Sequence, residues 1–263
     1  MSAPTLTVIT PVLNGADFIR QCLESVAEQE CERVVHLVVD GDSTDGTQDI
    51  VRAFAEEHPR VDLISERDSG QSDAMNRGIA TAQTAWIGFL NADDRYEFGA
   101  LNRTTTLMDG LQEPAFIYGN LQVWGDNGVD FGLHRPAPLS LLNLCRGKPY
   151  PLNPASYFYH KSLHTMAGLY AVEDHMTMDL DFLYRACQHA DVHYYDELWG
   201  HFNLIEGTKT QGDIATGESF KRQSALREKY LNDLPVLKRC WVKTANSMSP
   251  FCQKLVRRLK RHS

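Results

Sequence analysis

Two carboxylates follow an apolar run near residue 90, where they could bind a divalent cation. The run Trp86–Leu90 stops abruptly at Asn91-Ala92-Asp93-Asp94. Carboxylates at the tip of a buried strand are hard oxygen ligands in a fixed position. Mg²⁺ and Mn²⁺ bind to such ligands together with the phosphates of a substrate. The alternative is that the acidic pair only caps the next helix, and spacing alone does not separate the two.

A third carboxylate, Asp40, ends another apolar run and precedes the turn-forming segment Gly41–Gly46. At this position it could accept a hydrogen bond from a nucleobase N–H or a ribose hydroxyl. Ordinary turn chemistry would account for Asp40 taken alone. A binding role is favoured because these acids belong to the ends of neighbouring predicted strands.

The first half of the chain supplies a scaffold that would bring these strand ends together. Apolar, often β-branched runs predict strands, and apolar residues at helical spacing predict helices. Near-continuous apolar strands that alternate with helices predict an α/β fold, with a mostly parallel Rossmann-like sheet flanked by helices. Ligands of such sheets bind at the carboxyl ends of the strands. The predicted strands are Thr5–Val12, Val34–Val39, Val61–Ile64 and Trp86–Leu90, and the predicted helices are Ala16–Gln29, one around Ile50–Phe54, and Ser72–Gln83.

The second half is less regular. We expect a strand or hairpin arm at Ala115–Trp124, a strand at Ser156–His160, a helix at Asp179–Ala190, an extended segment at Val192–Phe202 and a mobile loop at Glu206–Gly217. We therefore divide the chain into one domain, residues 1–234, and a basic amphipathic tail, residues 235–263. Within the domain, residues 1–110 form a nucleotide-binding half and residues 111–234 an acceptor-side half.

Composition narrows the class of protein. The chain has 263 residues, of which 43% are hydrophobic and 23% charged, so it can bury a core. It shows neither a bilayer-length apolar stretch nor a secretory signal, which predicts a cytoplasmic protein. The six cysteines include no C-x-x-C pair, which argues against a zinc knuckle or a disulfide framework. The net charge of -8 is concentrated on the main body of the chain. Because nucleic acid is also negatively charged, we do not expect it as a partner.

The tail has the opposite charge. Basic residues and no acids occupy the segment from Lys238 to His262. Within it, Phe251–Arg261 places apolar residues on one stripe and basic residues opposite, as in a helix that lies on an anionic membrane surface. Such a helix would hold the protein at the inner face of the plasma membrane, near a lipid-linked acceptor. A helix packed on the domain with a solvated basic face is an equal alternative.

Four blocks in residues 5–109 together resemble the family 2 glycosyltransferases of the GT-A fold. Each block alone is weak, but their order and spacing are specific, and a weaker likeness continues to Asn153–Arg185 and Gly207–Lys209. The blocks are Val8-Ile9-Thr10-Pro11-Val12-Leu13-Asn14, Val39-Asp40-Gly41-Asp42-Ser43-Thr44-Asp45-Gly46-Thr47, Asp68-Ser69-Gly70 with Asp73-Ala74-Met75-Asn76-Arg77-Gly78-Ile79, and Phe89-Leu90-Asn91-Ala92-Asp93-Asp94.

The resemblance implies a nucleotide-sugar site that uses Mn²⁺ or Mg²⁺. Asn91-Ala92-Asp93 matches the family's D-x-D element, with Asp93 as the metal ligand and Asn91 in place of the first acid. Lys209 would close over the diphosphate. The remaining matches are Thr10, Pro11 and Asn14 lining the nucleoside pocket, Asp40 on the base or ribose, and Asp68 and Asp73 at further base and sugar contacts.

The resemblance also implies an inverting reaction, in which a base removes the proton of the acceptor hydroxyl. The family places this base in an acidic pair that opens a helix, and Met178-Asp179-Leu180-Asp181 occupies that position. Asp179 is the predicted base and Asp181 the reserve candidate. Met178 stands where the common pattern has Glu, and helix capping is the alternative role for Asp179.

The sequence thus predicts transfer of a sugar from a nucleotide diphosphate, by default UDP, to a glycan or lipid-linked acceptor in cell-envelope polysaccharide or glycolipid biosynthesis. The chain lacks G-x-G-x-x-G and G-x-x-x-x-G-K, which argues against dinucleotide and P-loop enzymes. A non-catalytic sugar-nucleotide-binding or scaffold protein that kept the fold is the alternative, because of Asn91 and Met178.

Overall fold

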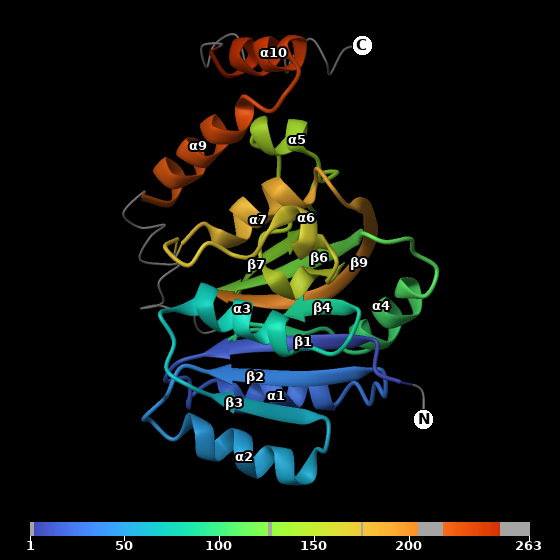
Figure 1. Ribbon diagram of the computed structural model, residues 1–263, viewed down its shortest axis with the longest axis vertical. Helices are drawn as coiled ribbons and strands as arrows, with labels where there is room; N and C mark the ends of the chain where they lie inside the picture. The colour runs from blue at the N-terminus through green and yellow to red at the C-terminus, as the bar shows by residue number, and fades with distance from the viewer. Residues whose placement is uncertain (1–2, 126–127, 175, 205–217, 248–263) are drawn as a thin grey trace.

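One sheet runs through the part of the chain that the computed structural model describes, residues 3–125, 128–174, 176–204 and 218–247. The strand order is β3-β2-β1-β4-β8-β6-β9-β5, and β7 pairs with β6 (Figure 1). The strands are β1 (Leu6–Val12), β2 (Val34–Asp40), β3 (Val61–Ser65), β4 (Trp86–Phe89), β5 (Arg95–Tyr96), β6 (Ala115–Gly125), β7 (Val129–His134), β8 (Tyr157–His160) and β9 (Asp191–Leu204).

The first four strands are parallel because a helix joins each to the next: α1 (Ile19–Ala27), α2 (Thr47–Glu57) and α3 (Gln71–Thr81). Their apolar runs are local signals, and the predicted strand boundaries hold to within one residue. Helix α1 begins three residues later than predicted, because the chain first turns at Gly15, whose carbonyl accepts the backbone N–H groups of Phe18 and Ile19.

The second half extends the same sheet. β8 pairs antiparallel with both β4 and β6, and β6 pairs parallel with β9. The strands expected at Ala115–Trp124 and Ser156–His160 and the extended segment at Val192–Phe202 are therefore all part of the sheet. The remaining helices are α4 (Ala100–Met108), α5 (Leu141–Cys145), α6 (Leu163–Ala167), α7 (Met178–Ala186), α9 (Glu218–Leu231) and α10 (Val236–Ser247), with a 3-10 turn at Pro154–Ser156.

Strand residues alternate between the two faces of the sheet, and each face has its own core. On β1, Val8 packs on the side of α1 and α4, whereas Ile9 packs on the side of α3 and α7. Helix α3 comes close to β1 because it carries Gly78: a Cβ there would lie 2.5 Å from Cγ2 of Ile9. The sheet is therefore covered on both faces, and the predicted α/β class is confirmed.

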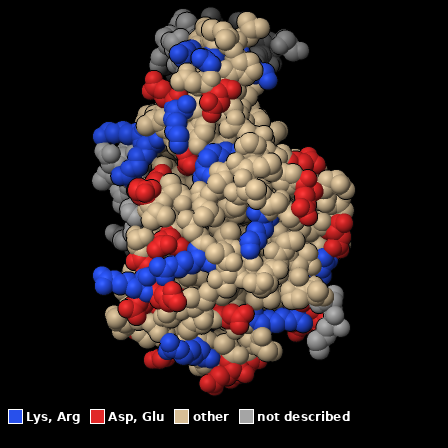
Figure 2. Space-filling model, in the orientation of Figure 1, with Lys and Arg blue, Asp and Glu red and all other residues tan. Residues whose placement is uncertain are grey.

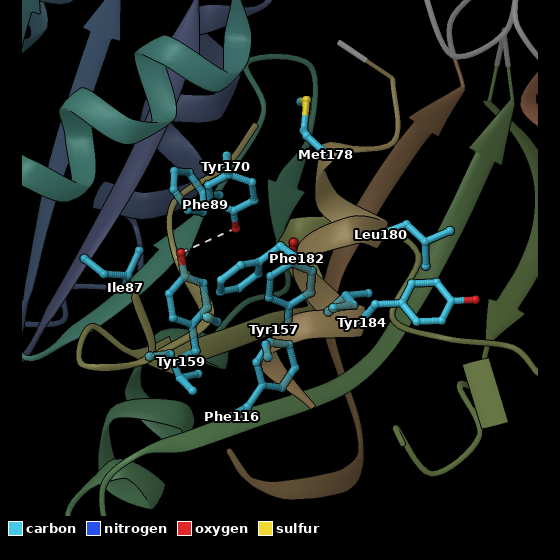
Figure 3. Packing of buried hydrophobic residues seen from close by; sticks show 14 of the residues in the cluster. Ile87, Phe89, Phe116, Tyr157, Tyr159, Tyr170, Met178, Leu180, Phe182 and Tyr184 are labelled. Carbon is cyan, nitrogen blue, oxygen red and sulfur yellow. Dashed lines mark hydrogen bonds between the residues drawn. The ribbon is translucent and has the colours of Figure 1, made fainter. Parts of the chain in front are cut away.

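The α7 side of the second half is built from stacked aromatic rings (Figure 3). Phe182 of α7 lies with its ring centroid 4.9 Å from that of Tyr159 and 4.8 Å from that of Tyr170. The hydroxyls of Tyr159 and Tyr170 are 3.4 Å apart. Because this cluster fixes α7 on the sheet, it also fixes the acidic residues in the first turn of α7.

Helices α9 and α10 lie at the opposite end of the molecule from α2 (Figure 1). Val242 of α10 and Leu234 before it are buried in the α7-side core. In the described part of the chain, no helix combines the length and apolar character needed to span a bilayer.

Candidate nucleotide-sugar site

A pocket of about 500 Å³ opens at the carboxyl edge of the parallel strands. Its walls come from the segment after β1, the segment after β4, the loop and first turn of α3, and the end of β9. The strand register explains this convergence. Val12 pairs with Asp40, and the backbone N–H of Leu90 donates to the carbonyl of Ile9, so the segments after β1, β2 and β4 leave the sheet together.

Asp40 is fully buried at the end of β2, and only half of its carboxylate is occupied. Oδ2 accepts the backbone N–H groups of Asp42 and Ser43 at 3.1 and 3.0 Å and the Ser65 hydroxyl at 2.9 Å. Oδ1 is shielded from solvent and has no hydrogen-bond partner among the described residues. An unpaired buried acceptor is costly, so this oxygen is an expected seat for a ligand N–H or O–H.

Asn14 connects the first strand to the loop after β2. Its backbone is in the left-handed region, with φ 52°, which Asn tolerates well. The backbone N–H of Asn14 donates to the Ser43 hydroxyl at 2.7 Å, and its side-chain oxygen accepts from the Thr44 N–H at 3.0 Å. Asn14 and Pro11 both line the pocket, and their assignment to the nucleoside stays a prediction.

Asp68 also lines the pocket, beside the Asp40 loop. A Cβ on Gly41 would lie 2.6 Å from Oδ2 of Asp68, so only glycine permits this approach. Asp73 does not line the pocket. Its carboxylate accepts from the backbone N–H of Ser69 at 3.0 Å and from Arg77 at 3.3 Å, and these contacts hold the loop that carries Asp68.

Asn91, Ala92 and Asp93 lie side by side on the pocket wall. The Asn91 amide is engaged, since it donates to Asp94 at 2.9 Å and accepts from Gln71 at 3.2 Å. The Asp93 carboxylate accepts no hydrogen bond from another described side chain, and burial raises its pKa. A partly desolvated carboxylate that faces a pocket without a partner is suited to a cation.

Asp94 is the second acid of the pair that follows β4, and it joins three elements beneath the pocket. It is 2% exposed and accepts hydrogen bonds from the side-chain amides of Asn91 and Asn153 and from the backbone N–H of Asn203. Burial and the neighbouring charge of Asp93 raise its pKa to about 7, against the opposing effect of these donors. Asp94 is thus a structural anchor of the Asp93 segment.

A metal at this site would depend on Asp93 and on the substrate. Within the described residues, no three His, Cys, Asp or Glu side chains are grouped so that they could hold an ion. Asp94 is fully engaged, and Asn91 is tied to Asp94. The residues fit a Mg²⁺ or Mn²⁺ ion held by one carboxylate together with substrate phosphates and water, which is the usual mode for Mg²⁺.

The expectation that Thr10 lines the pocket is wrong for its side chain. Thr10 is fully buried, and its hydroxyl lies 2.8 Å from Nε2 of His36 and 3.6 Å from Sγ of Cys22, under α1. The reason is the strand alternation: Thr10 shares its face of β1 with Val8, on the side away from α3.

Asp179, the predicted base, lies in the first turn of α7. Its Oδ1 is shielded from solvent and has no hydrogen-bond partner in the described part of the chain. Burial and, to a smaller extent, the charge of Asp174 raise the pKa of Asp179 to about 7. Asp174 holds the turn that precedes α7, since its carboxylate accepts from the backbone N–H of Thr177 at 2.8 Å.

Asp181 is a structural residue and not a free base. Its carboxylate accepts from Arg185 at 2.8 Å, Lys229 at 2.8 Å and Tyr230 at 2.9 Å, which ties α7 to α9. Burial would raise the pKa of Asp181, but hydrogen bonds from these three side chains outweigh it and lower the pKa. These contacts favour Asp179 over Asp181 as the base, and both assignments stay predictions.

Three predicted features lie outside the described residues: the loop Glu206–Gly217, Lys209 within it, and the Phe251–Arg261 helix of the tail. The structure also adds pocket residues that the sequence did not reveal. Phe18, 39% exposed, and Gln71 line the pocket, as does Asn203, whose amide donates to the Asp93 carbonyl. For Asn203 no local pattern was available, because it reaches the site from β9, more than a hundred residues along the chain from Asp93.

Comparisons with known proteins agree with this arrangement. The family described as "Glycosyl transferase family 2" matches residues 7–165. A PGL/p-HBAD biosynthesis glycosyltransferase of Mycobacterium bovis (strain BCG / Pasteur 1173P2) is 34% identical over 220 residues, which is 78% of this chain and 82% of that protein. A putative teichuronic acid biosynthesis glycosyltransferase, TuaG of Bacillus subtilis (strain 168), is 29% identical over 140 residues, or 52% and 55% of the two chains.

Solved structures share the fold. S. aureus TarS 1–349 in complex with UDP-GlcNAc superimposes with a TM-score of 0.66 and 20% identity, covering 90% of this chain and 70% of that one. The mannosyltransferase PcManGT from Pyrobaculum calidifontis, in complex with GDP-Man and Mn²⁺, gives a TM-score of 0.57 and 16% identity, covering 99% and 80%.

Proposed function

Because this chain belongs to glycosyl transferase family 2, we propose that it transfers a sugar from a nucleotide diphosphate, by default UDP, to an acceptor hydroxyl with inversion at the anomeric carbon. The observation that carries this proposal is the pocket at the strand ends. Asp68 and Asp93 both line this pocket of about 500 Å³. The buried, half-unpaired Asp40 carboxylate does not line it, but it precedes Gly41, which packs against Asp68.

The Asp40 and Asp93 carboxylates suit the two ends of a nucleotide diphosphate. Oδ1 of Asp40 can accept a hydrogen bond only from a donor, which a base N–H or a ribose hydroxyl provides. Asp93 is placed for the cation that accompanies a diphosphate, and Mn²⁺ or Mg²⁺ would offset the charge that develops on the leaving diphosphate. Asp68, beside the Asp40 loop, is assigned to the nucleoside or sugar. TarS complexes with UDP and UDP-GlcNAc support UDP as the first nucleotide to test.

Asp179 is the proposed base. A single displacement needs a group that takes the proton of the acceptor hydroxyl, and such a group works best with a pKa near the working pH. The pKa of about 7 and the unpaired Oδ1 of Asp179 meet both needs. Asp181 would serve only to hold α7 against α9.

The acceptor is proposed to be a glycan or a lipid-linked saccharide. The relatives named for PGL/p-HBAD and teichuronic acid biosynthesis support a role in cell-envelope polysaccharide or glycolipid formation. Helix α10 supports a site at an anionic membrane surface, on the inner face of the plasma membrane: Leu237 is 86% exposed, Trp241 is 49% exposed, and Lys238 and Lys243 are exposed beside them. Figure 2 shows Lys and Arg side chains over this end of the molecule.

Calorimetric titration with UDP, GDP and dTDP, each with Mn²⁺ and with a chelator, tests the proposal. Tight binding of one nucleotide that weakens with chelator is expected, and it would identify the donor class. If none of the three binds, the transferase proposal fails in favour of a protein that kept the fold without the activity.

A further inference from the structure

A second, smaller hollow lies between α5, α7 and α9, and it takes no part in the donor site. We call it the Arg227 pocket, after its main cation. It is lined by the segment Gly147–Tyr150 after α5, by Leu180 and Tyr184 of α7, and by Arg227 of α9. Its volume is about 60 Å³.

The Arg227 side chain is held in this hollow with donor capacity to spare. Nε of Arg227 is shielded from solvent and has no hydrogen-bond partner in the described part of the chain. Its guanidinium lies against Gly147, where an added Cβ would come within 2.9 Å of Nη2; Gly147 has φ 64°, so the backbone itself favours glycine there. Arginine stays protonated in proteins, so a guanidinium with an unpaired buried N–H favours the binding of an anion.

The other polar groups that line the hollow are one more cation, two phenols and the Gln223 amide, and Arg227 donates a hydrogen bond to the Tyr184 phenol. Lys148, which is exposed, lines the hollow together with the phenols of Tyr150 and Tyr184. Asp179 directly precedes Leu180 of the lining, and its charge, after burial, raises the pKa of Tyr150, while Arg227 lowers it. The hollow is therefore electropositive on one side and borders the proposed base on the other.

We propose that the Arg227 pocket binds a phosphate group carried by the acceptor, and so places the acceptor beside Asp179. This inference rests on the proposed function. The volume of the hollow limits the size of the ligand. One water needs roughly 10–15 Å³ of cavity volume. The hollow therefore holds a few waters or one phosphate group, but not a sugar ring. The Arg227 fork and Lys148 supply the N–H donors that phosphate oxygens accept.

The test is a titration with inorganic phosphate in the presence of saturating UDP and Mg²⁺, which fill the donor site. The readout is the ³¹P line width of the inorganic phosphate, which diamagnetic Mg²⁺ leaves interpretable. Wild-type protein is expected to bind phosphate. The Arg227→Gln variant is expected to bind phosphate at least ~10-fold more weakly, because it loses a charge-assisted contact. The Lys148→Gln variant is expected to lose less affinity. Arg222→Gln, on the same helix but outside the hollow, is the control and should match the wild type.

Two further arms identify the source of the phosphate. Dodecyl phosphate below its micelle concentration and glucose 1-phosphate are each titrated in the same way; tighter binding of the first supports a lipid phosphate, and tighter binding of the second a soluble sugar phosphate. Phosphate binding that is absent, or equal in wild type and Arg227→Gln, overturns the proposal. Failure of the donor assignment is distinct, because it appears as missing UDP binding in the wild type.

Discussion

The Asp94 carboxylate accepts a hydrogen bond from the Asn153 side chain at 2.8 Å, across 59 residues of sequence. This bond joins the segment after β4, which carries Asp93, to the turn that leads into β8. Asn153 is itself buried, and its oxygen accepts the backbone N–H of Ala155 at 2.8 Å. One amide thus stabilises both a buried acid and a turn at the border between the two halves.

We expect Asn153→Ala to lower the free energy of unfolding by roughly 2–3 kcal/mol, because it leaves a buried acceptor with one donor fewer. Urea unfolding measures the change. Asn143→Ala, which removes an exposed amide contact to Pro138, is the control and should lie within about 1 kcal/mol of wild type. Equal effects of the two variants would contradict the role given to Asn153.

Asp93→Asn is expected to remove the Mn²⁺-dependent part of nucleotide diphosphate binding, about 10–100-fold in affinity, while metal-free binding changes little. The physical reason is that the substitution removes the charge that faces the pocket and keeps the shape. Calorimetry with and without chelator gives both numbers. Asp62→Asn, an exposed position on β3, controls for loss of net charge, and an unchanged chelator effect in Asp93→Asn would refute the metal assignment.

Asp179→Asn should abolish transfer and leave donor binding within about twofold of wild type, since Asp179 does not line the donor pocket.

The Asp179→Asn variant should also unfold at a higher denaturant concentration than wild type at pH 8. The folded-state pKa of Asp179 is raised, so its stabilising contribution is present below the unfolded pKa and is lost as pH rises through about 7. Normal turnover by this variant would exclude Asp179 as the base.

The rate of transfer is expected to rise with pH through about 7 and then level off. A base must be deprotonated to act, and Asp179 has a pKa of about 7. Asp94 has a similar pKa, so a pH profile of Asp94→Asn separates the two acids. If the limb near pH 7 disappears in that variant, it belongs to Asp94 and not to the base.

Asp181→Asn is expected to cost about 2–4 kcal/mol of stability at pH 7, because it breaks a half-buried cluster with Arg185, Lys229 and Tyr230. The lowered pKa of Asp181 fixes the sign of the pH effect. The stabilisation is present above the unfolded-state pKa and fades as pH falls through the folded-state pKa, so the variant should approach wild type in acid. Asp49→Asn, an exposed ion pair with Arg52, should change stability little at any pH.

The parallel half of the fold could be predicted from sequence because its signals are local. Apolar runs predicted β1 to β4, and polar residues after these runs marked the edge of the sheet at which Asp40 and Asp93 lie. The anchor at Asp94 could not be found in this way, because its donors, Asn153 and Asn203, lie 59 and 109 residues away. The boundaries proposed at residues 110 and 234 stay predictions.

The sequence also did not indicate which face of the sheet a polar residue of a buried strand would take. In β1 both faces are covered, so the apolar pattern did not indicate that Thr10 turns toward His36 while Pro11 reaches the pocket. For Asp179 and Asp181, likewise, the sequence did not indicate which neighbours each side chain of the helix would contact. They are two residues apart and point to different neighbours, and only the packing of α9 revealed that Asp181 is fully engaged.

The antiparallel pairing of β4 with β8 has a consequence for dissection of the chain. A fragment cut after residue 110 would keep β4 but lose the strand that covers its outer edge, and it would expose a row of unpaired N–H and C=O groups beside Ile87. Such an edge is a template for self-association, so the fragment should aggregate. The nucleotide-binding half is therefore not a separable module, and the two halves should unfold in a single cooperative transition.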